Sequence, residues 1–257
     1  MATFLFDSIV FGPVRSRRLG VSLGVNLLPT NSKVCSFDCI YCECGWTASM
    51  DSGNLPTREQ VRWALDKKLS QMRLMGDSLD VITFAGNGEQ TLHPEFAGII
   101  DDTIQTRDHY FPDARIAVLS NATMLHRPDV NEALRLVDQN ILKLDSAFEN
   151  TIQVLNQPLI KFDVSKLVEQ LKQFRGNLII QTLFVRGRIK NQIIDNTTPE
   201  EINAWLKLIA EIKPKEVMVY TIARDTPAHD LTKVSIDELN EIAQRVTALG
   251  FPVQVSS

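Results

Sequence analysis

Long apolar runs and a strong excess of either charge are absent from this 257-residue sequence. No apolar stretch reaches the length of a membrane-spanning helix, and no basic residue precedes the first apolar residues, which Asp7 interrupts. These absences argue against a transmembrane helix and against a secretory signal peptide. The 27 basic and 31 acidic residues give a formal net charge of −4, without the bulk positive charge of a nucleic-acid-binding protein. We therefore expect a cytoplasmic protein with no membrane partner.

Cysteine is also scarce, because the chain has four and all of them lie between positions 35 and 44. Residues so close in sequence cannot crosslink distant parts of a fold, and thiols stay reduced in the cytoplasm. Disulfide bonds are therefore a poor explanation for the group. Metal binding or redox chemistry explains it better.

From about residue 20 onward, short β-rich runs alternate with amphipathic segments. The runs predict strands at 21–28, 80–85, 114–119, 141–145, 178–185 and 216–222, and a short final strand at 251–255. Helix starts are indicated by Thr57, Asp163, Thr198 and Ser235, and Gly176 is placed to end one helix. Nearly continuous apolar strands between helices favour a parallel sheet covered by helices. We predict a single α/β domain over residues 1–257, closed or partly closed into a barrel.

The cysteines follow the first predicted strand, and ligands in such folds lie at the carboxyl ends of the strands. Cys35, Cys39 and Cys42 have the spacing C-x₃-C-x₂-C. Three thiolates leave one iron of a four-iron cluster without a protein ligand, and short gaps let a loop wrap such a cluster. Two alternatives remain. Zinc would use Cys44 as a fourth ligand, although zinc sites usually draw on two separated pairs, or the thiols are simply buried without metal.

Three segments together resemble a known superfamily. They are the cysteine motif with Tyr41 before its last cysteine, the run Gly12-Pro-Val-Arg-Ser-Arg-Arg-Leu-Gly20, and the run from Gly86 to Phe96. This combination resembles the radical S-adenosylmethionine (SAM) superfamily, and within it a subgroup of small proteins related to the wyosine-forming tRNA enzymes. The resemblance covers most of the chain and implies a partial (β/α)6 TIM-like barrel of the radical SAM type.

The resemblance also implies the cofactors. Cys35, Cys39 and Cys42 would hold a [4Fe-4S] cluster whose open iron binds SAM. Reductive cleavage would then give a 5′-deoxyadenosyl radical that takes hydrogen from an unidentified substrate, with an electron donor such as flavodoxin or ferredoxin. The residues expected around SAM are Gly86, Asn87, Gly88, Glu89, Ser120, Asn121, Asp145, Gln181, Tyr220 and the backbone near Tyr41.

Some residues depart from the family or fall outside its motifs. The family commonly has proline where this chain has Gln90, and no further cysteines exist for the second cluster of the wyosine-forming enzymes. We therefore expect one cluster, with Cys44 as a bystander. Guanidinium groups suit carboxylate or phosphate recognition, so Arg186 and Arg224, at predicted strand ends, are the expected substrate contacts. Two alternative functions are an activating enzyme of the glycyl-radical type that acts on a protein partner, and a non-catalytic metal-binding or regulatory module.

Overall fold

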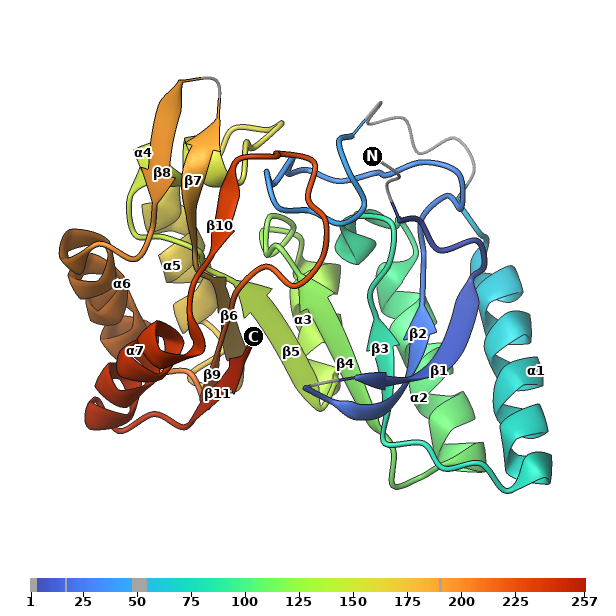
Figure 1. Cartoon of the computed structure of the whole chain (residues 1–257). Coiled ribbons are helices and arrows are strands. Elements are labelled where there is room, and N and C mark those ends of the chain that lie inside the picture. The colour runs from blue at the N-terminus through green and yellow to red at the C-terminus, as the bar shows by residue number, and fades with distance from the viewer. Residues whose placement is uncertain (1–3, 17, 48–54, 190) are drawn as a thin grey trace.

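A curled sheet of eight strands, covered on its outer face by helices, forms the body of the protein (Figure 1). The computed structural model describes all residues except 1–3, 17, 48–54 and 190. The strands lie in the order β1-β2-β3-β4-β5-β6-β9-β11. Their bounds are β1 Val10–Ser16, β2 Gly20–Val25, β3 Val81–Phe84, β4 Arg115–Ser120, β5 Gln139–Lys143, β6 Ile179–Leu183, β9 Glu216–Tyr220 and β11 Val253–Ser256.

All strand pairs in this sheet are parallel except β1–β2, which is an antiparallel hairpin. The six predicted strands are therefore confirmed as neighbours in chain order, and the predicted partial α/β barrel is confirmed as well. The first strand is shorter than predicted because the chain turns after Val25. The Asn26 side chain closes this turn by bonding both backbone groups of Leu28.

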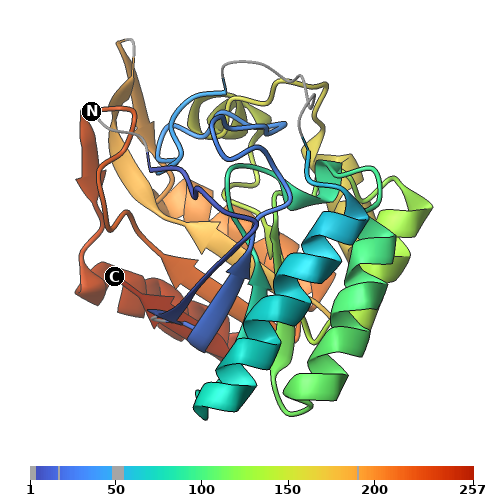
Figure 2. The ribbon, with the colours of Figure 1, turned by 90° about the vertical axis from the view of Figure 1, so that its right-hand side faces the viewer.

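The helices are α1 Arg58–Met75, α2 Phe96–Tyr110, α3 Pro128–Leu136, α4 Glu149–Leu155, α5 Val164–Lys172, α6 Pro199–Ile212 and α7 Ile236–Ala248, and η1 Gln90–Leu92 is a 3₁₀ turn. Figure 2 shows α1 and α2 side by side across the outer face of the sheet. Among the described residues, no helix is both long enough and apolar enough to cross a membrane.

Helix capping follows the sequence closely. Thr57 and Ser235 both complete capping boxes, and Asp163 accepts a hydrogen bond from the Lys166 amide. The Thr198 hydroxyl also caps its helix, but the carboxylate of Glu201 does not return to it. Glu201 instead accepts hydrogen bonds from the hydroxyls of Ser146 and Thr151. Helix α5 ends at Lys172, so Gly176 lies beyond the helix that it was expected to terminate.

A second sheet was not predicted. Strands β7 Val185–Ile189, β8 Gln192–Asp195 and β10 Leu231–Lys233 form it in the order β10-β7-β8. The predicted strand 178–185 is divided, because β6 ends at Leu183 and β7 begins at Val185. Figure 1 shows this small sheet above β6 and β9, beyond the carboxyl ends of those strands.

Three groups of buried apolar side chains hold these layers together. The largest lies between the sheet and its helices, and includes Phe84, Phe96 and Trp205. A smaller one, the interior cluster, fills the inside of the curled sheet and consists of Leu19, Val81, Ala117, Ile141, Ile179 and Met218. The third, the loop cluster, packs beneath the cysteine loop and is described with the site.

Candidate functional site

The cysteine loop begins where β2 ends, at the carboxyl edge of the sheet. Its backbone is bonded on one side to the glycine motif, since the Val34 amide donates to Asn87 O at 2.9 Å. On the other side, the Ile40 amide donates to Leu155 O at the end of α4, at 3.0 Å. The loop cluster lies beneath, with Phe37 and Ile40 packed among Leu155, Leu183, Val185, Ile194 and Ala228. The cysteines are therefore held on a packed, hydrogen-bonded loop.

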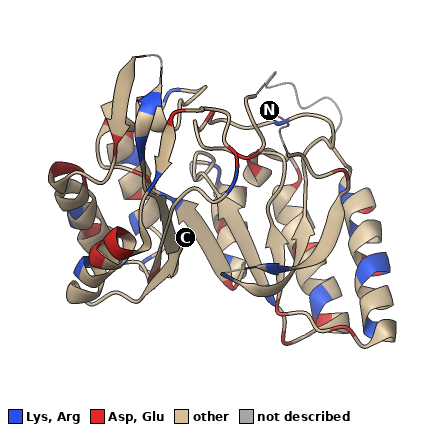
Figure 3. Ribbon diagram, in the orientation of Figure 1, with Lys and Arg blue, Asp and Glu red and all other residues tan. Residues whose placement is uncertain are grey.

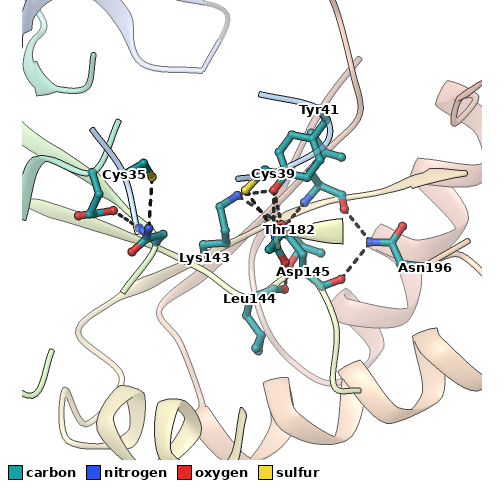
Figure 4. A network of polar contacts seen from close by, with 12 residues as sticks. Cys35, Cys39, Tyr41, Lys143, Leu144, Asp145, Thr182 and Asn196 are labelled. Atoms are coloured by element: carbon teal, nitrogen blue, oxygen red, sulfur yellow. Dashed lines mark hydrogen bonds and ion pairs between the residues drawn. The ribbon is translucent and has the colours of Figure 1, made fainter. Parts of the chain in front are cut away.

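Two of the three motif sulfurs are buried and accept hydrogen bonds from side-chain amides. Asn121 Nδ2 lies 3.6 Å from Cys35 Sγ, and Asn156 Nδ2 lies 3.3 Å from Cys39 Sγ. Figure 4 shows these thiols on either side of the Lys143 side chain. Burial raises the pKa of both thiols. Amide donors aimed at sulfur are a common feature around cluster thiolates, where they tune the potential of the iron.

The third motif cysteine is predisposed to ionise. A hydrogen bond with Cys44, assisted by the Lys33 ammonium, lowers the pKa of Cys42 to about 6. The same hydrogen bond raises the pKa of Cys44, whose thiol also lies 3.4 Å from the Gly86 carbonyl oxygen. The hydrogen bond between the two thiols therefore favours the thiolate form of Cys42 and the protonated form of Cys44.

Lys33 supplies positive charge beneath the loop. Its side chain is 1% exposed, and its ammonium lies 3.1 Å from Asp38 Oδ1 and 2.9 Å from Gly45 O. Burial alone would lower the pKa of Lys33, but the charges of Cys42, Cys35 and Cys39 raise it. The ammonium therefore stays charged and favours thiolates around it.

These four thiols are free of disulfides. Three of them have the spacing and the nearby cation that suit an iron–sulfur cluster, and two of these three, Cys35 and Cys39, also have amide donors. Within the described ranges, no group of three or more His, Cys, Asp or Glu side chains is arranged around a single metal ion.

The glycine motif is bonded directly to the cysteine loop. Gly88 has φ +132° and pairs with Val34, and a Cβ on Gly88 would lie only 1.9 Å from Val34 O. The Asn87 side chain turns away to the N-terminal segment, where it bonds both backbone groups of Phe6 and also Pro29 O. The absence of a side chain at Gly88 therefore lets the backbone of the glycine motif lie directly against the cysteine loop.

Gln90 stands where the family commonly has proline, and it ties this motif to the end of β2. Its side chain is fully buried, with Oε1 accepting from the Leu27 amide at 2.7 Å and Nε2 donating to Gly88 O at 3.3 Å. The Gln90 side chain therefore restrains this loop through hydrogen bonds, whereas a proline would restrain it through its ring.

Glu89 joins the glycine motif to the end of β4. One carboxylate oxygen accepts from Ser120 Oγ at 2.8 Å and from both donors of Thr91, and the other accepts from the Asn121 amide at 2.6 Å. Burial raises the pKa of Glu89, although these hydrogen bonds oppose the rise. Asn121 continues the contact to Cys35, so the glycine motif, the end of β4 and the first cysteine form one connected group.

A second connected group lies at the ends of β5 and β6 (Figure 4). Asp145 accepts hydrogen bonds from Tyr41 Oη, Asn156 Nδ2 and the Leu183 amide, while Lys143 Nζ lies 3.3 Å from its Oδ2. Burial and the charge of Asp145 raise the pKa of Tyr41. Burial alone would lower the pKa of Lys143, but attraction to Asp145 raises it. Asp145 thus holds the residue before Cys42 in place.

A cavity of about 310 Å³ opens beside Cys42, inside the curled sheet. Tyr41, Leu183, Tyr220 and Arg224 contribute to its lining. Gln181 lies on β6 two positions before Leu183, in register with Lys143 of β5 and Met218 of β9, so it faces the interior. Of the expected cofactor residues, Tyr41 and Tyr220 therefore border the cavity, and Gln181 belongs to the same face of the sheet.

The two expected substrate arginines occupy different environments. Arg224 lines the cavity and donates to Glu43 of the cysteine loop at 2.6 Å. Arg186 is on β7, where Nη2 donates to Thr197 and to Glu238 of α7, both at 2.6 Å. Its guanidinium therefore joins the small sheet to α7, and it is not among the residues that line the cavity. Figure 3 shows basic and acidic residues interspersed along the elements around the site.

Sequence reasoning missed Lys33, Lys143 and Asn156. Lys33 and Lys143 could have been found from the sequence. Lys33 lies two residues before Cys35 and Lys143 lies two residues before Asp145, and both Cys35 and Asp145 were expected site residues. Asn156 could not have been found in this way, because its contact with Cys39 joins positions 117 apart and the helix that positions it, α4, was not predicted.

The curled, partly closed sheet matches the fold of solved radical SAM enzymes. A radical SAM methyltransferase from Sphaerobacter thermophilus matches with a TM-score of 0.68 at 15% identity, covering 91% of this chain and 65% of that one. SuiB of Streptococcus suis, in a structure bound to S-adenosylmethionine, matches with a TM-score of 0.60 at 13% identity, covering 92% of this chain and 47% of that one.

Sequence relatives place the chain in a narrower group. UPF0026 protein slr1464 of Synechocystis sp. is 31% identical over 95% of this chain and 95% of its own length. A UPF0026 protein of Helicobacter pylori is 31% identical over 90% of this chain and 71% of its own length. The chain belongs to the UPF0026 family.

One further relative is much longer. A protein named GTPase Obg, from Brachyspira hyodysenteriae, is 30% identical over 96% of this chain, and the chain spans 34% of its length. The G-x-x-x-x-G-K-[ST] phosphate loop does not occur in this sequence. No protein-family model matches the chain.

Proposed function

We propose that this protein is a radical SAM enzyme with one [4Fe-4S] cluster held by Cys35, Cys39 and Cys42. The observation that carries the proposal is the bonding of the cysteine loop to the glycine motif through Val34, Gly88 and Glu89. This bonding brings the thiols and the motif expected to hold SAM into one unit at the carboxyl edge of the sheet. With four cysteines in the chain, a second cluster has no ligands, so we do not assign the wyosine-forming reaction.

Different residues of the site have different expected roles in binding the cluster and SAM. When bound, the reduced cluster and SAM supply a 5′-deoxyadenosyl radical that abstracts hydrogen from the substrate. Asn121 and Asn156 donate hydrogen bonds to the sulfurs of Cys35 and Cys39, and Lys33 stabilises thiolate charge. Glu89 fixes the end of β4, which carries Ser120 and Asn121 and where we expect the methionine part of SAM. Tyr41 and Tyr220 border the cavity where we expect the adenine.

The first experiment concerns the metal. Protein purified without oxygen should be brown and contain about four irons per chain. Replacing Cys42 with Ser should remove most of the iron, while the matched replacement of Cys44, in the same loop, should leave iron content unchanged. A colourless protein that contains zinc, with the zinc lost equally from the Cys42 and Cys44 variants, would contradict the proposal and favour a four-thiol zinc site.

The second experiment concerns turnover. Incubation of the iron-loaded protein with SAM and a strong reductant should release 5′-deoxyadenosine, and the Cys42→Ser protein should release none. An iron-loaded protein that never releases it would be a non-catalytic module. Deuterium transfer into 5′-deoxyadenosine from fractions of a labelled cell extract then identifies the substrate. Flavodoxin or ferredoxin, as the proposed electron donor, should replace the chemical reductant in the same assay.

A further inference from the structure

Arg18 places a guanidinium inside the curled sheet. It lies at the turn of the β1–β2 hairpin, and its carbonyl oxygen accepts a hydrogen bond from Gln254 Nε2 of β11 at 3.1 Å. Leu19, the next residue, belongs to the interior cluster. The hairpin turn thus reaches from one edge of the sheet to the other, and Arg18 joins the lining of the 310 Å³ cavity.

The guanidinium is oriented by an aromatic ring. Its central carbon lies 4.7 Å from the centroid of the Tyr220 ring. Stacking of this kind occupies the face of the guanidinium and leaves its N–H groups, which lie in the plane, available to an acceptor. Nη1 is buried and has no hydrogen-bond partner among the described residues. A buried charged donor without a partner is costly, and an anionic ligand would satisfy it.

The other charged groups near the cavity already have partners. Arg224 is paired with Glu43 at 2.6 Å, and Lys143 lies 3.3 Å from Asp145. The positive charge of Arg18 is therefore directed at the cavity, whose size suits a small molecule and whose walls include the apolar Leu119 and Leu183.

We propose that Arg18 binds an oxyanion, a carboxylate or a phosphate, of a small-molecule substrate. This substrate would occupy the part of the cavity lined by Arg18, Leu119 and Leu183, beside the region where we expect the adenine of SAM. The substrate role rests on the proposed function, whereas the binding of an oxyanion by Arg18 does not. Leu119 and Leu183 contact the apolar part of such a molecule, and Cys42 marks the wall of the cavity nearest the proposed cluster. The substrate class is thus a small organic acid or phosphate ester.

The test uses the iron-loaded protein, with inorganic phosphate and succinate as separate probes at constant ionic strength. Each probe is titrated while the thermal unfolding temperature is followed, since a ligand of the native state raises it. We expect a saturable rise with at least one probe, and the more effective one identifies the anion as phosphate or carboxylate. Arg18→Gln should weaken this binding at least about tenfold, because a charge-assisted pair is lost. Arg18→Lys should weaken it less, since it keeps the charge without the planar fork.

Arg15→Gln is the matched control, because Arg15 is an exposed arginine of the same hairpin and should leave the titration unchanged. Equal affinity in wild type and Arg18→Gln, or no saturable effect of either probe, overturns the inference. A variant that binds SAM more weakly while keeping its anion response also overturns it, by assigning Arg18 to the cofactor. Iron content, measured on every sample, separates these outcomes from failure of the proposed function.

Discussion

Gly88 occupies a position where no other residue fits. The carbonyl oxygen of Val34 would lie 1.9 Å from an added Cβ, and φ is +132°. We predict that Gly88→Ala lowers the free energy of unfolding by about 3 kcal/mol or more and reduces iron content, because the cysteine loop must move away. Chemical denaturation and iron analysis measure both effects. Gly76→Ala is the control, since nothing lies within 4 Å of its added Cβ and only φ +72° opposes it, at a cost of about 1 kcal/mol.

At the scale of single residues, the sequence predicts which side chains matter better than it predicts their partners. The spacing of Cys35, Cys39 and Cys42 needs no structure to be recognised. The partners of Asn87 and Asp145 do need it, because Asn87 bonds Phe6 across 81 positions and Asp145 accepts from Tyr41 across 104. Buried polar groups are almost always paired, but tertiary packing decides with which group.

Among the elements, the buried amide side chain of Gln90 helps to join the end of β2 to the glycine motif. Gln90 Oε1 accepts the Leu27 amide at 2.7 Å. We predict that Gln90→Ala destabilises the protein by about 1–3 kcal/mol, because the buried Leu27 amide loses its acceptor. Denaturant unfolding followed by circular dichroism measures the change. Replacement of the exposed Gln71 on α1 is the control and should change stability by less than about 0.5 kcal/mol.

The small sheet is attached to α7 through the pair of Arg186 and Glu238. Hydrogen bonds from Arg186 and Ser235 lower the pKa of Glu238 from 4.5 to about 2. A carboxylate with a lowered pKa stabilises the folded state above its ordinary pKa, and this contribution disappears as pH falls toward 2. We predict that Glu238→Gln reduces stability at pH 7 by at most about 1 kcal/mol, because solvent screens this partly exposed pair, and by nothing near pH 2.

Gln at position 238 keeps the capping geometry of α7, so the comparison isolates the ion pair. Unfolding midpoints in denaturant between pH 2 and pH 7 provide the measurement. In an Arg186→Gln background the same replacement should have almost no effect at any pH. A pH-dependent loss that persists there would show that Ser235, and not Arg186, is responsible.

The elements that were predicted and those that were missed differ in burial. The six predicted strands are mostly buried, as expected for parallel strands covered on both faces, and their sequences are rich in apolar residues. Strands β7, β8 and β10 are mostly half-buried or exposed and mix polar with apolar residues. Without a nearly continuous apolar run, such strands are not recognised from local pattern alone.

At the scale of the whole molecule, the cysteine loop has apolar support of its own. The loop cluster is distinct from the large cluster between the sheet and its helices. We predict that removal of iron increases amide hydrogen exchange in residues 35–42 by about tenfold or more, while β3, β4 and β5 keep their protection. Exchange measured by mass spectrometry on iron-loaded and iron-free protein provides the test. Uniform loss of protection would mean that metal and barrel form a single cooperative unit.

The contact between Gln254 and Arg18 spans 236 positions of the chain. During synthesis on a ribosome, the cysteine segment emerges long before Gln254 does, so its thiols are exposed to the cell while the cavity beside them has no completed wall. Contacts of such long sequence separation form late in folding as well. Insertion of the proposed cluster and the creation of the cavity are therefore separable in time, and a chain that acquired its metal early would do so before any small molecule has a place to bind.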